Sequence, residues 1–424
     1  MNNNHPHHGY CNIGRPLLID DILYEILHFL DSITILRICM KVSKQWRQVS
    51  LNIPLSLSFQ ARANKIRRNL SKLPDEMDGI KFAESIANSS EYLKNLTQLD
   101  ISANRIGPEG ISILLQSENG LKNLISLNVA SNDIGLKGVI CIAHCEHLTF
   151  LDIHENQIGT EGTRVIANSP NLQHLTSLNL YCNQIGPMGA QYIASSPYLK
   201  NLTNLDLASN DLDSESISFI ATSENLKKLS WLCLHDNPIG SEGAQFIANS
   251  DHLTSLTCLE MYGCNIGSEG VTFLANSPTL KNLLTLDLSG NQVTSEGAIS
   301  IANSPTLKNL TDLVMYANQI DSKGAESIGN SPTLKNLTSL ILSDNHLGSE
   351  GAHFIVNSSH LDKLTLLDMS LNEIGPEGVT LIASNENLKR LRTLDLSDNC
   401  MGLHTTVFIS HLENLKNLTS FVKQ

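Results

Sequence analysis

The sequence predicts an α/β solenoid preceded by a small α-helical module. An asparagine, replaced once by Cys264, recurs every 27 residues from Asn156 to Asn399 and closes a segment of the form L-x-x-L-x-L-x-x-N. A short stretch with helical spacing follows each of these segments. Residues 15–52 have a different, irregular helical periodicity. Since a unit of 27 residues cannot bury its apolar face alone, neighbouring units are expected to stack into one continuous core.

Residues 229–249 illustrate one unit, LSWLCLHDNPIGSEGAQFIAN. The L-x-x-L-x-L part is a short strand with inward leucines and outward intervening side chains. Ser241 is expected to cap the following helix, and Glu242 suits its positive end. Glycine turns such as the one at Gly240 recur in most units without a following Lys-Ser/Thr, so they are turns and not phosphate loops.

The repeated asparagine should bridge backbone groups that the turn leaves without partners, because its amide both donates and accepts. Stacking of the units would then line up these side chains as a buried ladder. Cys264 interrupts the series, and a thiol is a weak donor. We expect that unit to be held less well than its neighbours.

A strand, a turn and a helix in 27 residues resemble the ribonuclease-inhibitor type of leucine-rich repeat. The resemblance covers residues 89–424, about 12 repeats and a truncated C-terminal cap. It implies a curved horseshoe with parallel strands on the concave face and helices outside.

Residues 1–13 form a polar tail that we expect to be disordered. Residues 14–52 follow as a helical module too small to be stable alone. They contain the segments LIDDI, EIL, FLD and VSKQWR, which resemble an F-box, although Ile19 stands where that family usually has proline. The resemblance implies docking to a Skp-type adaptor through Leu18, Ile22, Ile26, Leu30, Leu36, Val42 and Trp46. A helical cap on the first repeat is the alternative.

Residues 53–88 are predicted to be a linker and N-terminal cap. Leu55, Leu57 and Phe59 alternate like a degenerate strand. The basic stretch 61–68 fits a solvated helix better than a nuclear-localisation signal.

Composition excludes several classes of partner. The net charge is −13, and the chain up to Asp75 is basic, so the repeats are strongly acidic. Duplex nucleic acid is therefore not expected as the partner, whereas a target protein with a basic segment would suit this charge. No run is apolar enough to span a membrane, and nine cysteines without framework spacing favour a reducing compartment, so we expect a cytoplasmic or nuclear protein.

Three outward positions per unit lie six, four and two residues before the repeated asparagine. The middle position is often acidic, which either serves a basic ligand or is simply part of the repeat. Adjacent strands should place Tyr262 beside His235, and Trp231 beside Cys258. Exposed aromatic residues commonly anchor interfaces. The predicted partner-binding face comprises Phe150, His154, Tyr181, Trp231, His235, Glu260, Tyr262 and Tyr316.

Catalytic and metal sites are not predicted. Cys233, His235 and Glu260 should lie close together, but on an open face without an oxyanion site. The spacing C-x-x-H-C-x-H from Cys141 to His147 is not a recognised zinc framework. We expect no cofactor and no enzymatic activity.

The order of an F-box followed by repeats resembles the F-box/leucine-rich-repeat substrate receptors of cullin-based ubiquitin ligases. This implies a Skp-type adaptor and a cullin scaffold as partners, with an unknown target protein on the concave face. A ligase-independent scaffold or inhibitor, or a regulator of small GTPases, remains as an alternative.

Overall fold

The computed structural model describes residues 55–58, 75–88, 93–116, 121–385, 387–400 and 418–422. The predicted F-box positions Leu18, Ile22, Ile26, Leu30, Leu36, Val42 and Trp46 lie outside these residues, so their docking role stays a prediction.

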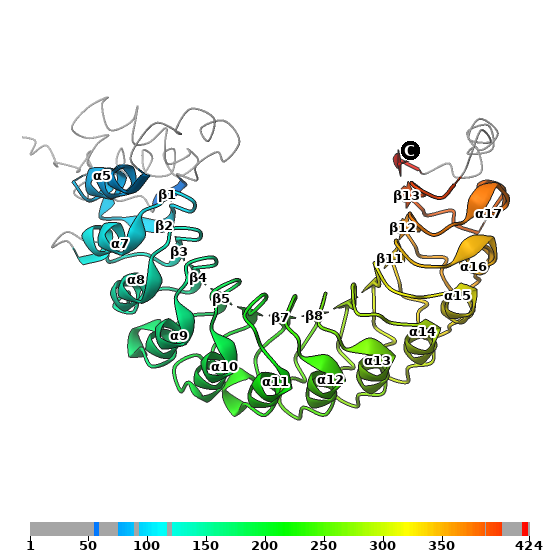
Figure 1. Ribbon diagram of the computed structural model, residues 1–424, viewed down its shortest axis with the longest axis horizontal. Helices are drawn as coiled ribbons and strands as arrows, with labels where there is room; N and C mark the ends of the chain where they lie inside the picture. The colour runs from blue at the N-terminus through cyan, green and yellow to red at the C-terminus, as the bar shows by residue number, and fades with distance from the viewer. Residues whose placement is uncertain are drawn as a thin grey trace, which may run out of the picture.

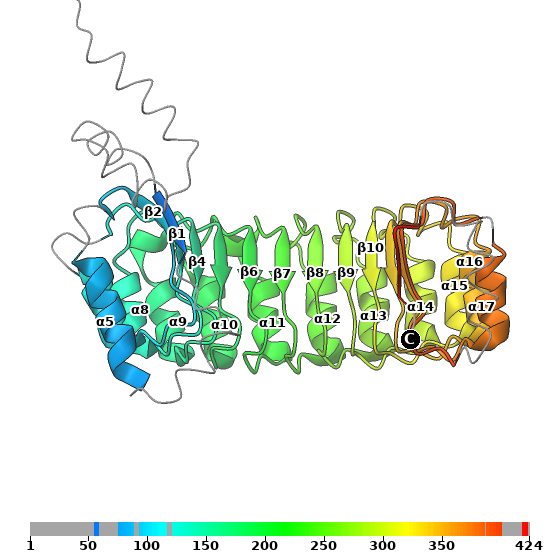
Figure 2. The same cartoon turned by 90° about the horizontal axis from the view of Figure 1, so that it is seen from above.

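The described chain is a curved solenoid in which strands line the inner face and helices the outer face (Figure 1). One parallel sheet of 14 strands runs through it in sequence order. Viewed from above, the strands lie side by side along the whole arc (Figure 2). The predicted α/β solenoid is confirmed.

The strands are β1 (Leu55–Ser58), β2 (Leu96–Asp100), β3 (Ser126–Asn128), β4 (Phe150–Asp152), β5 (Ser177–Asn179), β6 (Asn204–Asp206), β7 (Trp231–Cys233), β8 (Cys258–Glu260), β9 (Thr285–Asp287), β10 (Asp312–Val314), β11 (Ser339–Ile341), β12 (Leu366–Asp368), β13 (Thr393–Asp395) and β14 (Ser420–Val422). The α-helices are α5 (Asp75–Ala87), α7 (Gly107–Gln116), α8 (Gly135–Ile142), α9 (Gly159–Ala167), α10 (Gly186–Ser195), α11 (Ser214–Ala221), α12 (Gly240–Ala248), α13 (Gly267–Ala275), α14 (Ser295–Ala302), α15 (Ser322–Gly329), α16 (Gly348–Val356) and α17 (Gly375–Ala383). Short 3-10 turns occur at η2 (Pro170–Leu172) and η3 (Glu224–Leu226).

The sheet begins earlier than the first full repeat. β1 pairs in parallel with β2, and Leu55 and Leu57 are buried in the common core. A strand is therefore present at Leu55–Ser58 and extends the sheet of the first repeat, whereas Phe59 of the expected strand lies outside the described residues.

The repeated asparagines form the predicted buried ladder. Asn156 is representative: its Nδ2 donates to the carbonyls of Ile153 in its own unit and Val129 in the preceding unit, at 2.9 and 3.0 Å. Its Oδ1 accepts the N–H groups of Asn132 and Ile134 at 3.0 and 3.2 Å. Each such amide thus joins two consecutive units while it satisfies backbone groups that are cut off from water.

The asparagine ladder stabilises a left-handed backbone conformation that most residues avoid. Non-glycine residues next to these asparagines have φ values near +55°, for example Glu155 and Gln157, both at 54°. L-residues adopt this left-handed conformation at a cost. Five hydrogen bonds to one side chain compensate for it at Asn156.

A second ladder closes the outer side of the repeat. Ser250 and Ser277 donate their hydroxyl protons to the carbonyls of Ala221 and Ala248, at 2.5 and 2.6 Å. Those carbonyls end the helices of the preceding units, where no intrahelical donor remains. From α9 to α16, the serine that follows the helix therefore ties it to the helix before it.

The expected helix cap at Ser241 is wrong. α12 begins after Ile239 without a side-chain cap, and the Ser241 hydroxyl instead donates to Glu269 in the next helix at 2.9 Å. A side-chain cap does occur at Asp213, whose carboxylate accepts the N–H of Ser216. In units such as this one, the left-handed Gly240 is the first residue of the helix. Ser241 is therefore already inside the helix and is not at the capping position.

The ladder changes at Cys264, whose thiol donates to the Leu234 carbonyl at 3.1 Å in place of an amide. The Ile239 N–H would meet an asparagine oxygen in a regular unit, but it bonds to the Asn237 carbonyl at 2.8 Å. The Asn237 N–H is left with the sulfur, a poor acceptor. Pro238 also lies here, where the neighbouring unit has left-handed Asp211, and proline cannot take a positive φ.

We predict that Cys264→Asn raises the free energy of unfolding by about 1 kcal/mol, because an amide oxygen would again accept the Asn237 N–H. Urea unfolding followed by circular dichroism measures this. The matched reverse change, Asn291→Cys, should lower stability by about 1–3 kcal/mol. A Cys264→Asn protein with an unchanged or lower midpoint would contradict the role assigned to the ladder.

Candidate functional site

The concave face is built from three columns of outward side chains. They stand six, four and two residues before each ladder residue, and the parallel register places equivalent positions side by side, as in the pairs Trp231–Cys258 and Cys233–Glu260. Both neighbour relations expected from the period, Trp231 with Cys258 and His235 with Tyr262, are present.

The aspartates of the middle column have a structural task. The Oδ1 of Asp206 accepts the N–H of Ala208 at 3.0 Å, and that of Asp368 accepts the N–H of Ser370 at 2.9 Å. Asn128 and Asn179 make the same bond with their amide oxygens. This bond explains why the position has a short side chain with an acceptor oxygen. It does not explain why that side chain is usually charged, since asparagine makes the same bond.

The face is acidic and contains no permanent cation. From β2 to β13 none of the outward positions is lysine or arginine. The carboxylates are Asp100, Asp152, Asp206, Glu260, Asp287, Asp312, Asp368 and Asp395. Like charges in adjacent strands repel one another, so a positively charged partner would relieve this cost.

The predicted partner-binding residues occupy neighbouring strands with one exception. Phe150, His154, Tyr181, Trp231, His235, Glu260 and Tyr262 lie on or just after β4, β5, β7 and β8. Tyr316 follows β10 and stands apart from this group. The most exposed are Phe150, Tyr262 and Tyr316, at 36%, 38% and 39%.

His154 is paired with its own strand. Its Nδ1 lies 2.7 Å from Asp152 Oδ1, and its ring centroid lies 5.9 Å from that of Tyr181. The hydrogen bond to Asp152 raises the pKa of His154 above its usual 6.5, against the opposing effect of burial.

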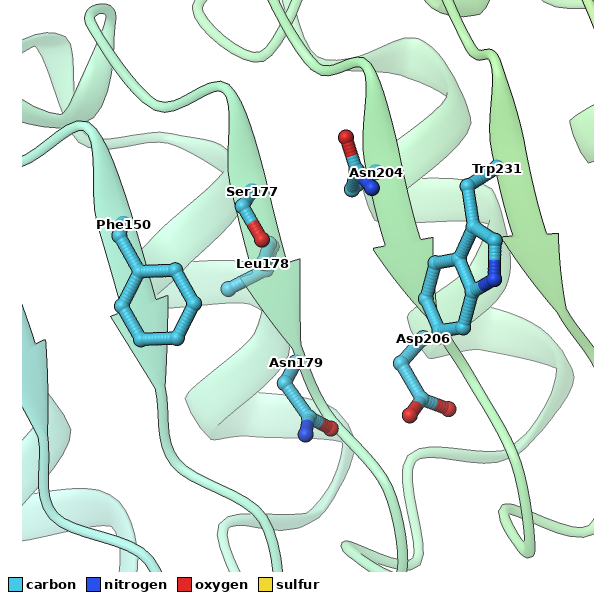
Figure 3. A pocket seen from close by; sticks show the side chains of 7 residues that line it. All are labelled: Phe150, Ser177, Leu178, Asn179, Asn204, Asp206 and Trp231. Carbon is cyan, nitrogen blue, oxygen red and sulfur yellow. The ribbon is translucent and has the colours of Figure 1, made fainter.

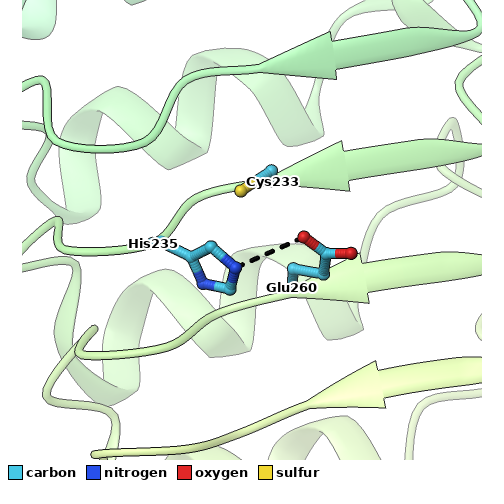
Figure 4. Close-up of side chains that lie close together, drawn as sticks. All are labelled: Cys233, His235 and Glu260. Atoms are coloured by element: carbon cyan, nitrogen blue, oxygen red, sulfur yellow. Dashed lines mark ion pairs between the residues drawn. The ribbon is translucent and has the colours of Figure 1, made fainter. Parts of the chain in front are cut away.

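A second hydrogen-bonded group surrounds Glu260 on β7 and β8 (Figure 4). Its Oε1 accepts from the Trp231 indole N–H at 3.0 Å and from the Cys258 thiol at 3.4 Å. Its Oε2 lies 3.3 Å from His235 Nε2. The hydrogen bond from His235 is the main reason that the pKa of Glu260 is lowered.

His235 accepts the backbone N–H that the middle-column aspartate accepts in other units. Because Glu260 is one methylene longer than aspartate and points at Trp231 and His235, the N–H of Tyr262 donates to His235 Nδ1 at 2.7 Å. The histidine therefore accepts at Nδ1 and presents its Nε2 to the carboxylate.

This hydrogen bonding disfavours a metal at Cys233, His235 and Glu260, although their ligand atoms lie within 4.8 Å of one another. A metal on Nε2 would leave the ring proton on Nδ1, directly opposite the Tyr262 N–H. A thiol nucleophile is disfavoured as well, because burial raises the pKa of Cys258 to about 12 and also raises that of Cys233. In the segment from Cys141 to His147, burial raises the pKa of the Cys145 thiol to about 12, which disfavours the thiolate that zinc would need.

A shallow pocket of about 250 Å³ lies between Phe150 and Trp231 (Figure 3). Two strands separate these rings, and they carry the small polar residues Ser177, Asn179, Asn204 and Asp206 that line the pocket. These four residues were not among the predicted site residues. Their column position was visible in the sequence, but a pocket arises only where large side chains flank small ones.

Comparisons with known proteins agree with this architecture. A family model described as "Leucine Rich repeat" matches nine segments that make up about half of the chain: 92–114, 120–143, 144–167, 171–194, 198–221, 252–275, 279–302, 333–356 and 360–383. An F-box domain model matches residues 16–57, close to the predicted 14–52. Both resemblances are confirmed. No curated protein matches the chain significantly.

Solved structures align with this chain at low identity. The yeast Rad7 and Elc1 complex aligns with 20% identity over 84% of this chain and 90% of that chain, at a TM-score of 0.50. An internalin (inlF) from Listeria monocytogenes aligns with 20% identity over 83% and 98%, at a TM-score of 0.48. The TLR13–ssRNA13 complex aligns with 23% identity over 73% and 41%, at a TM-score of 0.46. None of the helices in the described part of the chain has the length and apolarity to cross a membrane.

We predict that the pKa of His154, measured by NMR titration, lies above 6.5 and falls toward that value in Asp152→Asn. The asparagine keeps the acceptor for the backbone but removes the charge that favours the imidazolium. Because the folded pKa is raised, the stability from this pair is present below pH 6.5 and is lost as pH rises through the folded pKa. An unchanged His154 pKa in Asp152→Asn would contradict the pairing.

Proposed function

Since the chain belongs to the F-box/leucine-rich-repeat family, we propose that it is the non-catalytic substrate-recognition subunit of an SCF-type ubiquitin ligase. The two modules together indicate a protein-binding role in ubiquitin ligase complexes, and the F-box indicates a Skp-type adaptor as partner. We also propose that the complex contains a cullin scaffold and that the chain is the receptor for a specific target protein.

The F-box half of the proposal assigns adaptor docking to its apolar positions. The helical module expected from the sequence of residues 14–52 is too small to be stable alone and would need a partner to complete its apolar core. The residues proposed to supply it are Leu18, Ile22, Ile26, Leu30, Leu36, Val42 and Trp46.

The observation that carries the target half is the acidic concave face without lysine or arginine, together with its aromatic group on β4 to β8. Aromatic residues that are fixed by hydrogen bonds lose little entropy on binding. Trp231 meets this condition, because Glu260 holds its indole. Phe150, His154, Tyr181, Trp231, His235, Glu260, Tyr262 and Tyr316 are proposed to contact the target.

The proposed chain performs no bond chemistry. By holding the adaptor through one module and the target through the other, it raises the concentration of the target near the transfer machinery. F-box/leucine-rich-repeat proteins are typically adaptors of this non-catalytic kind.

We predict that Leu30→Ala combined with Trp46→Ala abolishes capture of a purified Skp-type adaptor, because two large apolar contacts are lost at once. The circular dichroism of the repeats should not change, since both residues precede the first described strand in the sequence. Undiminished capture by this variant would rule out the ligase assignment and favour a ligase-independent scaffold.

We predict that Trp231→Ala combined with Tyr262→Ala weakens target capture by at least tenfold and leaves adaptor capture unchanged. Proximity labelling with the full chain identifies candidate targets, and a chain without residues 1–52 separates them from adaptor-dependent neighbours. Purified targets then allow affinities to be measured. Full target binding by the double variant would move the binding site away from this face.

A further inference from the structure

We propose that the pocket between Phe150 and Trp231 binds one cationic side chain, lysine or arginine, of the bound polypeptide, with Asp206 as its counter-charge. This inference rests on the proposed function, because it assigns a partner chemistry to one place on the same concave face.

The pocket has two aromatic walls and a polar floor (Figure 3). Phe150 rises from β4 and Trp231 from β7, and the strands between them carry Ser177 and Asn204 at the equivalent positions. A cation over an aromatic ring is attracted by the negative face of that ring, most strongly with tryptophan. The long apolar stem of lysine or arginine can lie between the rings while the charged end reaches the floor.

Trp231 is fixed before any ligand binds. Its indole N–H donates to Glu260 on the far side from the pocket, at 3.0 Å. The six-membered ring then leans toward Asp206 (Figure 3). A wall that is already in place costs little entropy when a ligand enters.

Asp206 is a carboxylate that has no lysine or arginine beside it on the neighbouring strands. One oxygen accepts the Ala208 N–H, and the Cys233 thiol also hydrogen-bonds to the carboxylate. The titratable groups that act on it include His235, His154 and Glu260, and the outward positions of the neighbouring strands include no lysine or arginine. Burial raises its pKa, as expected for a carboxylate that has lost water without gaining a permanent cation.

The floor also has donors for a peptide backbone. Asn179 and Asn204 use their Oδ1 atoms within the chain, toward the Tyr181 N–H and the Thr203 hydroxyl. Their Nδ2 groups are oriented by these bonds and can donate to peptide carbonyls. These polar groups lie beside Leu178 and between apolar walls, and a few polar groups in an apolar pocket fix the orientation of a ligand.

Trp231 supplies a direct readout. The chain has two tryptophans, so Trp46→Phe leaves Trp231 as the sole indole. The probes are four acetylated and amidated tripeptides with serine at both ends and lysine, arginine, norleucine or glutamate in the centre. We expect lysine and arginine to change Trp231 emission saturably, and norleucine and glutamate to bind at least tenfold more weakly. Equal binding of norleucine, or no saturable change with lysine and arginine, would overturn the inference.

Asp206→Asn tests the counter-charge, and Asp368→Asn is its matched control. Both aspartates occupy the middle column and accept a backbone N–H, at 3.0 and 2.9 Å. Asparagine is already present at this position as Asn128 and Asn179, so the fold tolerates the change. We expect Asp206→Asn to weaken lysine-peptide binding roughly tenfold, the loss of one partly desolvated charge pair, and Asp368→Asn to leave it unchanged. Equal weakening by the two variants would mean that the peptide responds to the overall negative charge of the face and not to Asp206. That outcome would overturn the assignment.

Failure of this inference can be told apart from failure of the proposed function. Adaptor capture does not involve the pocket and should be normal in Asp206→Asn. If Trp231→Ala with Tyr262→Ala abolishes target binding while Asp206→Asn leaves it intact, the face binds the target without a cation in this pocket, and the inference fails alone. If neither variant changes target binding, the proposed role of the concave face fails with it.

Discussion

The buried asparagine amide is the interaction on which the whole solenoid depends. At the end of each strand the chain makes a turn with left-handed residues, and the turn leaves N–H and carbonyl groups facing the core. At Asn183 the amide accepts from the backbone of the preceding unit and donates to carbonyls in both units. One side chain per unit thereby fixes the turn and the stacking together. The arc of strands in Figure 1 is the result of repeating that bond.

The proposed recognition surface follows from the same constraint. Because the turns are uniform, positions 27 residues apart become lateral neighbours, and three columns of side chains face the concavity. Where the middle column has aspartate or asparagine, the side chain accepts a backbone N–H. Aspartate is the commonest residue in this column, and from β2 to β13 the outward positions include no lysine or arginine. The negative charge is therefore part of the repeat, and the proposed partner would supply the complementary charge.

Much of this was predictable from the sequence because the period converts spacing into contact. The Asn156 ladder, the Cys264 irregularity and the pairing of His235 with Tyr262 all follow from counting residues. The acceptor role of His235 was not predictable, since it depends on the length and direction of the Glu260 side chain. The start of α12 was missed because a left-handed glycine and a capping serine give the same sequence signal at Ser241. The pocket beside Asp206 was missed because it requires knowing how far Phe150 and Trp231 project above small neighbours. The F-box contacts stay predictions, since those residues lie outside the described part of the chain.

Amide hydrogen exchange, read by mass spectrometry along the repeats, tests the central role of the asparagine amide most directly. The backbone N–H groups at 156–158, 183–185 and 210–212 bond to amide oxygens of the next unit and should exchange slowly. The turn at 237–239 lacks that acceptor and should exchange faster than its neighbours. Rapid exchange in all four turns, or equal protection at 237–239, would contradict the account.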